Sequence, residues 1–542
     1  MVSTAVDQSA RAAATAERVR PAWRDGLDHF LLYGSFAAAM WFTFASSVDD
    51  PFITLRYAYN LLHGHGPVFD PGQRVNGATS PVGLLLAVVA LAIPGGYAFL
   101  KLKLLSLVFG VMTLVAARRL IDTFDFPGWG RSTALVLVGS SAPLAFASAS
   151  GLETTACVFA VTALLVELRL GRAFDRPLRA ALLSALAVAA RPEAALTVAL
   201  LGVAALAMER EWPLRSRAAW LLGAMAAAVS IGLFNWLYYA TPLPNTFYAK
   251  DVTLSHALPQ GAHYMESAFR IAPSSVLTPG VYTLALISLP IGLALLGVGW
   301  ATALARPRHL GYVAIVPFAQ AAFILKSGGD WMHGYRFLAP AVVGIAVLQA
   351  SGAVTVASAA RRWTRAGPFA AVFSAALIIP LCNTYGVPWQ HDSVTALAGG
   401  LSDKNLIAAG GYRGFSPLWT YIGDQLACAR PGDLVATSEA GYVTFSHPAL
   451  DFMDLRGLTN TQIPRAAPAA LRQVVGVTDV DWWRATSPVG RVLLGAQPVL
   501  IVTIDGSPPT TVLDAEYRLR TVIEVRQVKD YVYGRVGSSC AP

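Results

Sequence analysis

The sequence predicts an α-helical protein that crosses a membrane many times and ends in a soluble α/β or α+β domain. Of its 542 residues, 55% are hydrophobic and only 13% are charged, and the mean hydropathy is +0.51. Soluble chains carry about a quarter charged residues, so a water-soluble enzyme is excluded, and so is a disordered chain. The net charge of +9 indicates basic cytoplasmic loops and not nucleic-acid binding, because no basic patch is interleaved with aromatic residues.

The N-terminal segment 1–26 is polar and contains Arg11, Arg18, Arg20 and Arg24. The uncharged run Phe30–Val48 follows it and is long enough to cross the hydrocarbon core. Because no A-x-A cleavage site precedes Asp49, we expect an uncleaved first span. The positive-inside rule then places residues 1–26 in the cytoplasm and Asp49 on the outer face.

Residues 27–386 are expected to form a membrane domain of about 10 to 12 transmembrane helices. Further apolar runs lie at about 81–97, 99–117, 132–149, 154–168, 180–207, 217–239, 281–303, 310–326, 337–357 and 368–386. Basic loops, which are expected to be cytoplasmic, lie at Arg169–Arg179, Glu209–Arg217, Arg306–His309 and Arg361–Arg365.

Two topologies remain open between residues 81 and 207. Simple alternation makes 180–207 one crossing and leaves the basic loop 169–179 outside. The charge rule instead favours one fewer crossing between 81 and 119, together with a pair of half-helices broken at Arg191-Pro192-Glu193. Such breaks at membrane depth are tolerated where they line a protein cavity.

The tail 387–542 is polar enough to form a soluble domain on the outer face. Strand-like runs lie at Asp433–Phe445, Pro498–Ile504 and Arg520–Tyr533, and a shorter run with a glycine turn lies at Asp451–Leu458. The cysteines show no CxxC spacing, so neither a zinc cluster nor a disulfide scaffold is expected. Cys428 and Cys540 both lie in the tail and could pair in an oxidising compartment.

Two adjacent carboxylates, Asp49 and Asp50, follow the first span. Pro51 suits the first turn of a helix, and apolar residues recur at helical spacing up to Leu62, which predicts an amphipathic helix on the membrane interface. One aspartate would suffice to cap that helix. A second one points to a general base for an acceptor hydroxyl at the membrane surface.

The first outer loop, 49–80, continues as a Gly/Pro/Asn-rich segment that returns to the bilayer. His63 and His65 lack a third ligand at a standard spacing, so a hydrogen bond to a sugar or a turn role is favoured over a metal site. Further along, Glu153 lies between two apolar runs and Arg191 and Glu193 lie inside another. Ionisable residues at membrane depth are candidate functional groups, although a buried Arg–Glu pair that only locks helices together is an equal alternative.

Two more outer segments carry polar residues. Lys250 follows a span and suits a phosphate, the alternative being a snorkelling lysine among lipid headgroups. The short loop 328–337 contains Asp330, Trp331, His333 and Arg336 among three glycines. The aromatic residues alone would anchor the interface, whereas the charged ones indicate a polar pocket wall in which Arg336 pairs with a phosphate or a carboxylate.

Five blocks of the chain, in this order, resemble the GT-C superfamily of polytopic glycosyltransferases, and within it the mycobacterial terminal β-(1→2) arabinofuranosyltransferase family. The blocks are Asp49-Asp50 with Arg56, Asn60-Leu61-Leu62, Gly64–Phe69, Arg74-Val75 and Thr79-Ser80; then Ser150–Glu153; Arg191–Glu193; Tyr238-Tyr239 with Ala249–Asp251; and Gly328–Gly334.

The resemblance implies a GT-C fold and transfer of a sugar, with arabinofuranose as the best guess, from a polyprenyl-phosphate donor to a cell-envelope glycan or protein acceptor. It implies a multi-pass protein of the bacterial inner membrane whose active site faces outward, with the Asp49–Asp50 pair as base. The leaving phosphate needs positive charge, and the candidates are Arg56, Arg191, Lys250 and Arg336. The candidate substrate-binding residues are His65, Asn76, Thr79, Glu153, Glu193, Asp330, Trp331 and His333.

Direct displacement by one hydroxyl with one base predicts inversion at the anomeric carbon. The same fold would serve a mannosyl or other hexosyl transferase. A lipid-linked sugar flippase is the alternative from another class, and a non-catalytic scaffold would leave the five blocks unexplained. No organic cofactor is expected, while a divalent cation shared by the two aspartates remains open.

Overall fold

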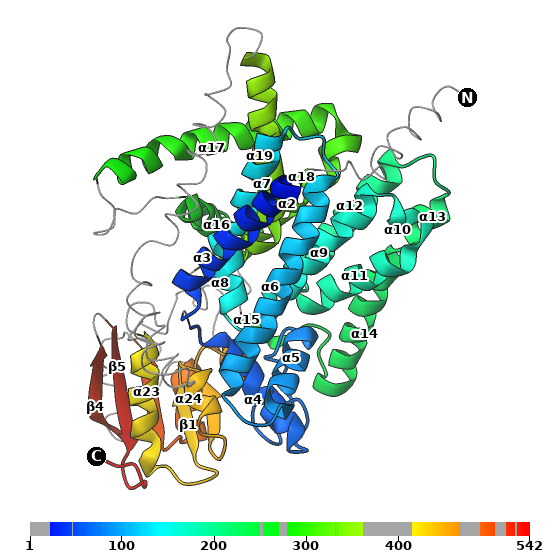
Figure 1. Ribbon diagram of the computed structural model, residues 1–542. Helices are drawn as coiled ribbons and strands as arrows, with labels where there is room; N and C mark the ends of the chain where they lie inside the picture. The colour runs from blue at the N-terminus through cyan, green and yellow to red at the C-terminus, as the bar shows by residue number, and fades with distance from the viewer. Residues whose placement is uncertain are drawn as a thin grey trace.

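The computed structural model describes residues 22–45, 47–249, 253–269, 279–330, 332, 334–360, 415–466, 488–504, 516–525 and 528–542. A bundle of apolar helices carries a small C-terminal sheet domain at one end (Figure 1). We name this end, which also holds helices α4 (Asp50–Leu62) and α5 (Pro81–Ala92), the domain end. The opposite end, with α2 (Ala22–His29), α10 (Arg172–Asp175) and α13 (Leu214–Ala219), is the far end.

The first predicted span is helical from α2 through a π-helical turn (Phe30–Gly34) to α3 (Ser35–Thr43). It leads into α4, which begins as predicted, with Pro51 in its first turn. Most of its residues are buried, and only its C-terminal Leu61 and Leu62 are exposed, because the C-terminal domain packs against it. Its position on the membrane interface stays a prediction.

Helix α5 packs along α4 and does not lead to the far end. After the turn at Pro94–Gly96, α6 (Ala98–Asp122) starts at the domain end and runs the length of the bundle. Near the end of α6, Arg118 forms an ion pair with Asp25 of α2, which marks the far end. This arrangement agrees with the topology that has one fewer crossing between 81 and 119.

The helices α7 (Gly128–Gly139) and α8 (Ala142–Ala149) lead back to the domain end, and α9 (Thr154–Arg169) returns to the far end. The next two, α11 (Pro177–Ala190) and α12 (Ala194–Met208), form a hairpin broken at residues 191–193. At the far end, Tyr312 donates to Glu209 just after α12, at 3.1 Å, and Arg169 donates to the carbonyl of Arg308 at 3.0 Å. The break predicted from charge is therefore present at the domain end, and the basic loop 169–179 lies at the far end.

The later helices are α14 (Leu221–Tyr239), α15 (Asn245–Ala249), α16 (Leu254–Phe269), α17 (Pro279–Ala305), α18 (Pro307–Ser327) and α19 (Val342–Ala360). Five helical segments of the described chain are long and apolar enough to cross a membrane, and the protein is accordingly a multi-pass membrane protein. They are Ala98–Asp122, Gly128–Ala149, Leu214–Tyr239, Leu310–Ser327 and Ala339–Ala359. The span predicted at 368–386 lies outside the described residues.

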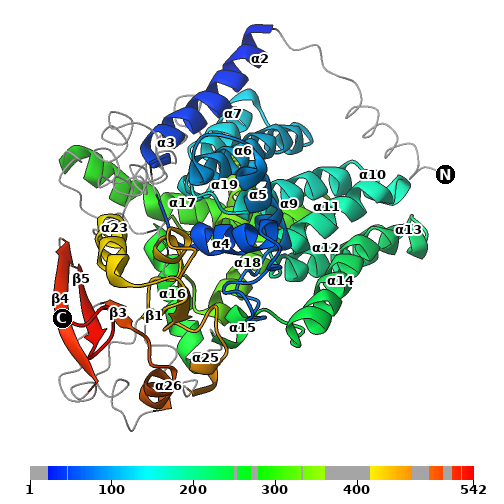
Figure 2. The same ribbon diagram turned by 90° about the horizontal axis from the view of Figure 1, so that it is seen from below.

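The C-terminal domain contains a five-stranded sheet in the order β2-β1-β3-β5-β4. The central β1 (Leu434–Thr437) pairs in parallel with β2 (Asp451–Asp454) and β3 (Leu500–Ile504), while β5 (Val528–Arg535) is antiparallel to β3 and to β4 (Tyr517–Val525). The expected α/β or α+β character is confirmed. The run 433–445 is not one strand, because the chain turns after Thr437 into the short helix α24 (Tyr442–Phe445), and this turn faces α4 (Figure 2).

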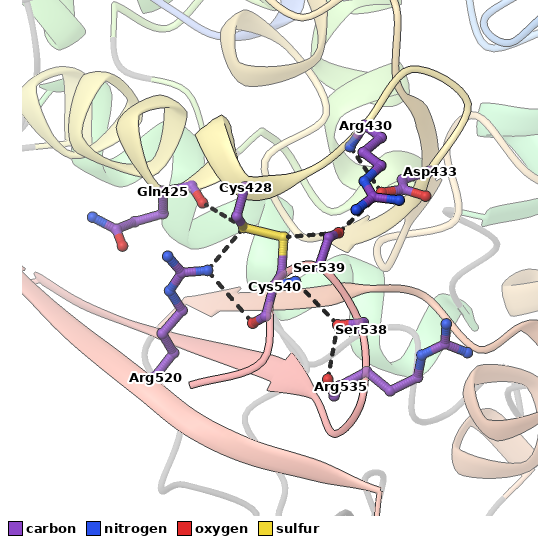
Figure 3. Close-up of a disulfide and its surroundings, with 9 residues drawn as sticks. All are labelled: Gln425, Cys428, Arg430, Asp433, Arg520, Arg535, Ser538, Ser539 and Cys540. Atoms are coloured by element: carbon purple, nitrogen blue, oxygen red, sulfur yellow. Dashed lines mark hydrogen bonds between the residues drawn. A yellow bond between two sulfur atoms is a disulfide. The ribbon is translucent and has the colours of Figure 1, made fainter.

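A disulfide joins Cys428 to Cys540, as the sequence allowed (Figure 3). Cys428 ends the 3-10 turn (Leu426–Cys428) after α23 (Phe415–Gln425), and Cys540 lies two residues from the C-terminus. Arg520 of β4 donates to the sulfur of Cys428 at 2.8 Å and to the carbonyl of Cys540 at 3.4 Å. The disulfide therefore fixes the end of the chain against the sheet.

Replacing Cys428 and Cys540 by serine is expected to destabilise the C-terminal domain by about 2–4 kcal/mol, because the bridge closes a loop with a sequence separation of 112 residues. Thermal unfolding and limited proteolysis of the purified protein measure the loss. A reductant should lower the melting temperature of the wild type and leave the double variant unchanged. An unchanged melting temperature after full reduction, verified by mass spectrometry, would contradict the prediction.

Candidate active site

A charged cluster lies at the domain end, where α4 begins and the loop before α19 returns to the bundle. Arg336 connects two carboxylates: its Nη1 lies 2.9 Å from Oδ2 of Asp50, and its Nη2 lies 3.3 Å from Oδ1 of Asp330. The Nε of Arg336 also contacts Asp330. The side chains of Arg336 and Asp330 are only 7% and 2% exposed, so this ion pair is almost fully removed from water.

Glycines shape the loop that carries Arg336 and Asp330. Gly329 and Gly334 adopt φ values of +84° and +80°, which L-residues rarely adopt. A Cβ at Gly329 would collide with the ring of Tyr264, and one at Gly334 would collide with the ring of Phe146. These two sites allow the loop to turn sharply within a packed environment, and the turns bring Asp330 and Arg336 together, with Arg336 reaching Asp50.

The broken helix pair contributes a second arginine. Arg191 donates from Nε to Glu193 at 2.6 Å and from Nη1 to Glu153 at 3.3 Å. Its guanidinium lies 5.2 Å from the centre of the Phe337 ring, and that of Arg336 lies 5.4 Å from the same ring. The structure therefore gathers six predicted site residues around one phenylalanine: Asp50, Glu153, Arg191, Glu193, Asp330 and Arg336.

Within this cluster, Asp50 is the most accessible group, with 24% of its side chain exposed. The other five side chains are at most 14% exposed. A carboxylate that is held by an arginine and still reaches solvent can accept a proton from an incoming hydroxyl. The contacts of the described residues use three of the five N–H donors of each arginine, so both retain the capacity to bind an anion.

Asp49, next in sequence, points to a different partner. It precedes α4 without capping it through its side chain. Instead its two carboxylate oxygens accept hydrogen bonds from the backbone N–H groups of Gly441 and Tyr442, at 2.7 and 2.8 Å. Burial, together with the smaller effect of the Asp50 charge, raises the pKa of Asp49 to about 7, against the lowering effect of the two N–H donors. The two aspartates, predicted together, thus lie in separate environments.

We expect the stability of the folded protein to fall as the pH rises from about 4 to about 7. Burial raises the pKa of Asp49 to about 7 and that of Asp70 to about 6, so in this window the folded state binds more protons than the unfolded state. Each such group contributes at most about 1.4 kcal/mol per pH unit. Thermal unfolding at several pH values should give a shallower slope for Asp49→Asn than for the wild type. The exposed Asp424 provides the control, and equal slopes for Asp49→Asn and Asp424→Asn would contradict the assignment.

Arg56 was predicted to bind phosphate, and the structure gives it other partners. It is 1% exposed and forms an ion pair with Asp70 at 2.7 Å. Its Nε donates to the carbonyl of Phe69 at 2.8 Å, and its Nη groups donate to carbonyls of the loop around α24, including that of Leu450 at 2.8 Å and that of Thr444. A phosphate would have to displace all of these, so we exclude Arg56 from the proposed site and assign it to docking of the C-terminal domain.

Three other predicted residues lie in the first outer loop, away from these contacts. The side chain of Asn76 donates to Asn235 at 2.9 Å, and the hydroxyl of Thr79 lies 2.9 Å from that of Thr246. Both therefore join the first outer loop to the segment around the end of α14. His65 is exposed. The predicted residues Lys250, Trp331 and His333 lie outside the described residues.

The sequence analysis missed Lys103 of α6, which is fully buried. Its Nζ donates to the carbonyls of Phe44 at 2.8 Å and Ala149 at 2.5 Å, which end α3 and α8 and carry the partial negative charge of helix C-termini. These two helix ends lead directly to Asp49 and to Glu153. A lysine within an apolar span was the available signal, since such residues are seldom incidental.

Among the described residues, no group of three or more His, Cys, Asp or Glu side chains is placed to hold a metal ion. The described residues therefore offer no such set of ligands for the divalent cation that the sequence analysis considered. The steps proposed below use only the chain's own residues.

No protein-family model matches the chain. Two curated relatives carry the name terminal β-(1→2)-arabinofuranosyltransferase, which confirms the resemblance seen in the motifs. The relative from Mycobacterium tuberculosis is 30% identical over 333 residues, covering 54% of this chain and 50% of the relative. The one from Corynebacterium glutamicum is 27% identical over 403 residues, covering 63% and 53%. The chain thus spans about half the length of the curated relatives it matches.

Solved structures show the fold. ArnT from Cupriavidus metallidurans in the apo state superposes with a TM-score of 0.50 at 12% identity, covering 94% of this chain and 98% of ArnT. ArnT bound to undecaprenyl phosphate gives 0.50 at 13% identity, covering 94% and 99%. The predicted GT-C fold is confirmed.

Proposed function

We propose that the protein is a membrane glycosyltransferase that moves a sugar from a polyprenyl-phosphate donor to a cell-envelope glycan or protein acceptor. The observation that carries the proposal is the ion pair of Asp50 with Arg336, next to Arg191 and its two glutamates, at the domain end of an apolar bundle. The names of the relatives support arabinofuranose as the sugar. The undecaprenyl phosphate bound by ArnT supports a lipid-linked donor.

Asp50 is our candidate for the general base. The acceptor hydroxyl gives its proton to the Asp50 carboxylate while its oxygen attacks the anomeric carbon of the donor. The bond between that carbon and the phosphate oxygen breaks, and the electron pair leaves with the polyprenyl phosphate. Arg336 orients Asp50 through the 2.9 Å contact, so the base is held in place before the acceptor arrives.

Arg191 and Arg336 are our candidates for binding the donor phosphate. Negative charge grows on the phosphate as the glycosidic bond breaks, and fixed cations in a site sheltered from water stabilise that charge. Glu153 and Glu193 hold Arg191, and with Asp330 they are also suited to accept hydrogen bonds from sugar hydroxyls. The lipid tail would lie along the apolar helices.

We place the domain end outside the bacterial inner membrane. The disulfide in the C-terminal domain suits an oxidising compartment. The basic segments around α10 and α13 lie at the far end, as the positive-inside rule requires of cytoplasmic loops. A donor carried by a lipid on the outer face would thus reach Asp50 from the side, through the bilayer.

The decisive experiment incubates the purified full-length protein in nanodiscs with polyprenyl-phosphate arabinofuranose and a synthetic arabinan acceptor. We expect release of polyprenyl phosphate and an acceptor longer by one sugar, with the anomeric configuration inverted. Turnover with a polyprenyl-phosphate hexose but not with the arabinofuranose donor would show that the sugar is a hexose. A product with retained anomeric configuration would overturn the proposed mechanism of a single displacement. Movement of the donor between leaflets without transfer to any acceptor would favour a flippase and overturn the proposal.

A further inference from the structure

We propose that the C-terminal domain is part of the active site, because a cradle formed by the backbone N–H groups of Gly441 and Tyr442 holds Asp49 and thereby positions Asp50. In this assignment Asp49 is a positioning residue and does not touch the substrate. The inference rests on the proposed function, since it explains how that site is assembled. It adds a role for the C-terminal domain and for the sequence Gly441-Tyr442, which no motif singled out.

The contact between Asp49 and the cradle is specific. Each carboxylate oxygen receives one backbone N–H, at 2.7 and 2.8 Å, so the C-terminal domain fixes both oxygens of Asp49. Asp49 as a whole residue is 7% exposed, so water does not replace these donors easily. A carboxylate left there without them would be buried and unpaired, which is costly.

Gly441 is required for this approach. A Cβ at this position would collide with the main-chain oxygen of Asp49 and with its carboxylate. Any side chain at 441 would therefore push the domain away from α4 or turn Asp49 out of the cradle. The turn from β1 into α24 brings Gly441 here, and Tyr442 extends the contact by packing its ring against Phe52 at 5.2 Å.

One face of the start of α4 contacts the segment around α24. Asp49, Phe52 and Arg56 follow each other at helical spacing, and each contacts the segment from Gly441 to Leu450. Asp50 points elsewhere, to Arg336 of the helical bundle. The start of α4 is thus held by two contacts: Asp49 binds the C-terminal domain, and Asp50 binds Arg336 in the loop before α19. Loss of the Asp49 contact would allow the first turn of α4 to move and would change the orientation of the Asp50 carboxylate.

The test compares Gly441→Ala with Gly495→Ala in the full-length protein in nanodiscs. Gly495 lies in α26 (Pro488–Ala496) of the same domain, and a Cβ there meets open space. We expect Gly441→Ala to lower kcat at least tenfold with the donor KM changed by less than threefold, and Gly495→Ala to match the wild type. The double variant Gly441→Ala with Asp49→Ala should be no more than threefold slower than the slower single variant, because both changes break the same contact.

A second measurement does not depend on activity. Hydrogen exchange of backbone amides should increase in Gly441→Ala at the first turn of α4 and at α24, and remain as in the wild type in strands β1 and β3. If the wild type transfers no sugar, the proposed function fails, whereas the exchange result still tests the cradle. Unchanged exchange at α4, a kcat equal to that of the wild type, or multiplying effects of Gly441→Ala and Asp49→Ala would each overturn the inference.

Discussion

Asp50→Asn is expected to lower kcat for sugar transfer by at least about a hundredfold while the protein still binds the donor lipid. Asparagine has nearly the same shape and can still accept a hydrogen bond from Arg336, but it cannot take a proton from the acceptor hydroxyl. General-base catalysis typically contributes 10²–10⁴-fold, and in this site no other carboxylate is as exposed as Asp50. The measurement is release of polyprenyl phosphate under saturating donor and acceptor.

The matched control is Asp175→Asn. Asp175 lies at the far end of the bundle with 67% of its side chain exposed, so the same chemical change there should leave kcat within twofold of the wild type. Donor binding to Asp50→Asn, measured with a labelled lipid, should remain within about threefold. If Asp50→Asn retains a tenth or more of the wild-type kcat, Asp50 is not the base.

Arg336→Lys is expected to lower kcat/KM by at least a hundredfold and to destabilise the protein by about 1–3 kcal/mol. Lysine keeps the positive charge, yet one ammonium group cannot reproduce the fork that contacts Asp50 and Asp330 at once. Asp330 is 2% exposed, and leaving part of the hydrogen bonding of a buried group unsatisfied costs about that much. Thermal unfolding and steady-state kinetics of the purified variant measure the two effects separately.

Two further variants separate the structural effect of Arg336 from its chemical effect. Arg176→Lys is the control, because Arg176 lies at the far end with 88% of its side chain exposed; we expect little change in either quantity. The double variant Arg336→Gln with Asp330→Asn removes both charges of the buried pair. It should recover most of the stability that Arg336→Lys loses, without recovering activity. Recovery of activity in the double variant would show that Arg336 serves stability alone.

Much of this site can be predicted from the sequence, because polar motifs at the ends of apolar runs must lie at one of the two membrane surfaces. Asp50, Arg336 and Asp330 come from loops on the same expected side of the membrane, and Arg191 from a Pro-containing break in an apolar run. The structure brings all four to one location. For the loops of Asp50, Asp330 and Arg336, hydropathy and charge sufficed, since the bilayer restricts each loop to one of two ends, whereas the placement of Arg191 depended on which of the two topologies holds.

What the sequence did not reveal are contacts made by the backbone. Arg56 looks like a phosphate ligand by residue type, and only the tertiary fold shows that carbonyls of the loop around α24 use its donors. The roles of Asp49 and Asp50 could not be separated either, because the partner of Asp49 is a pair of amides that any residue possesses. Side-chain chemistry is visible in a sequence, whereas the location of a free amide is not.

The contact between Asp49 and Gly441 joins positions separated by 392 residues. During synthesis the first span and α4 enter the membrane long before Gly441 has been made, and Cys540, which closes the disulfide of the C-terminal domain, is made later still. A nascent chain can therefore occupy the bilayer, among the cell's lipid-linked sugars, with Asp49 still lacking its amides. Under the proposed function and location, sugar transfer begins only after the C-terminal domain has been exported, folded and oxidised.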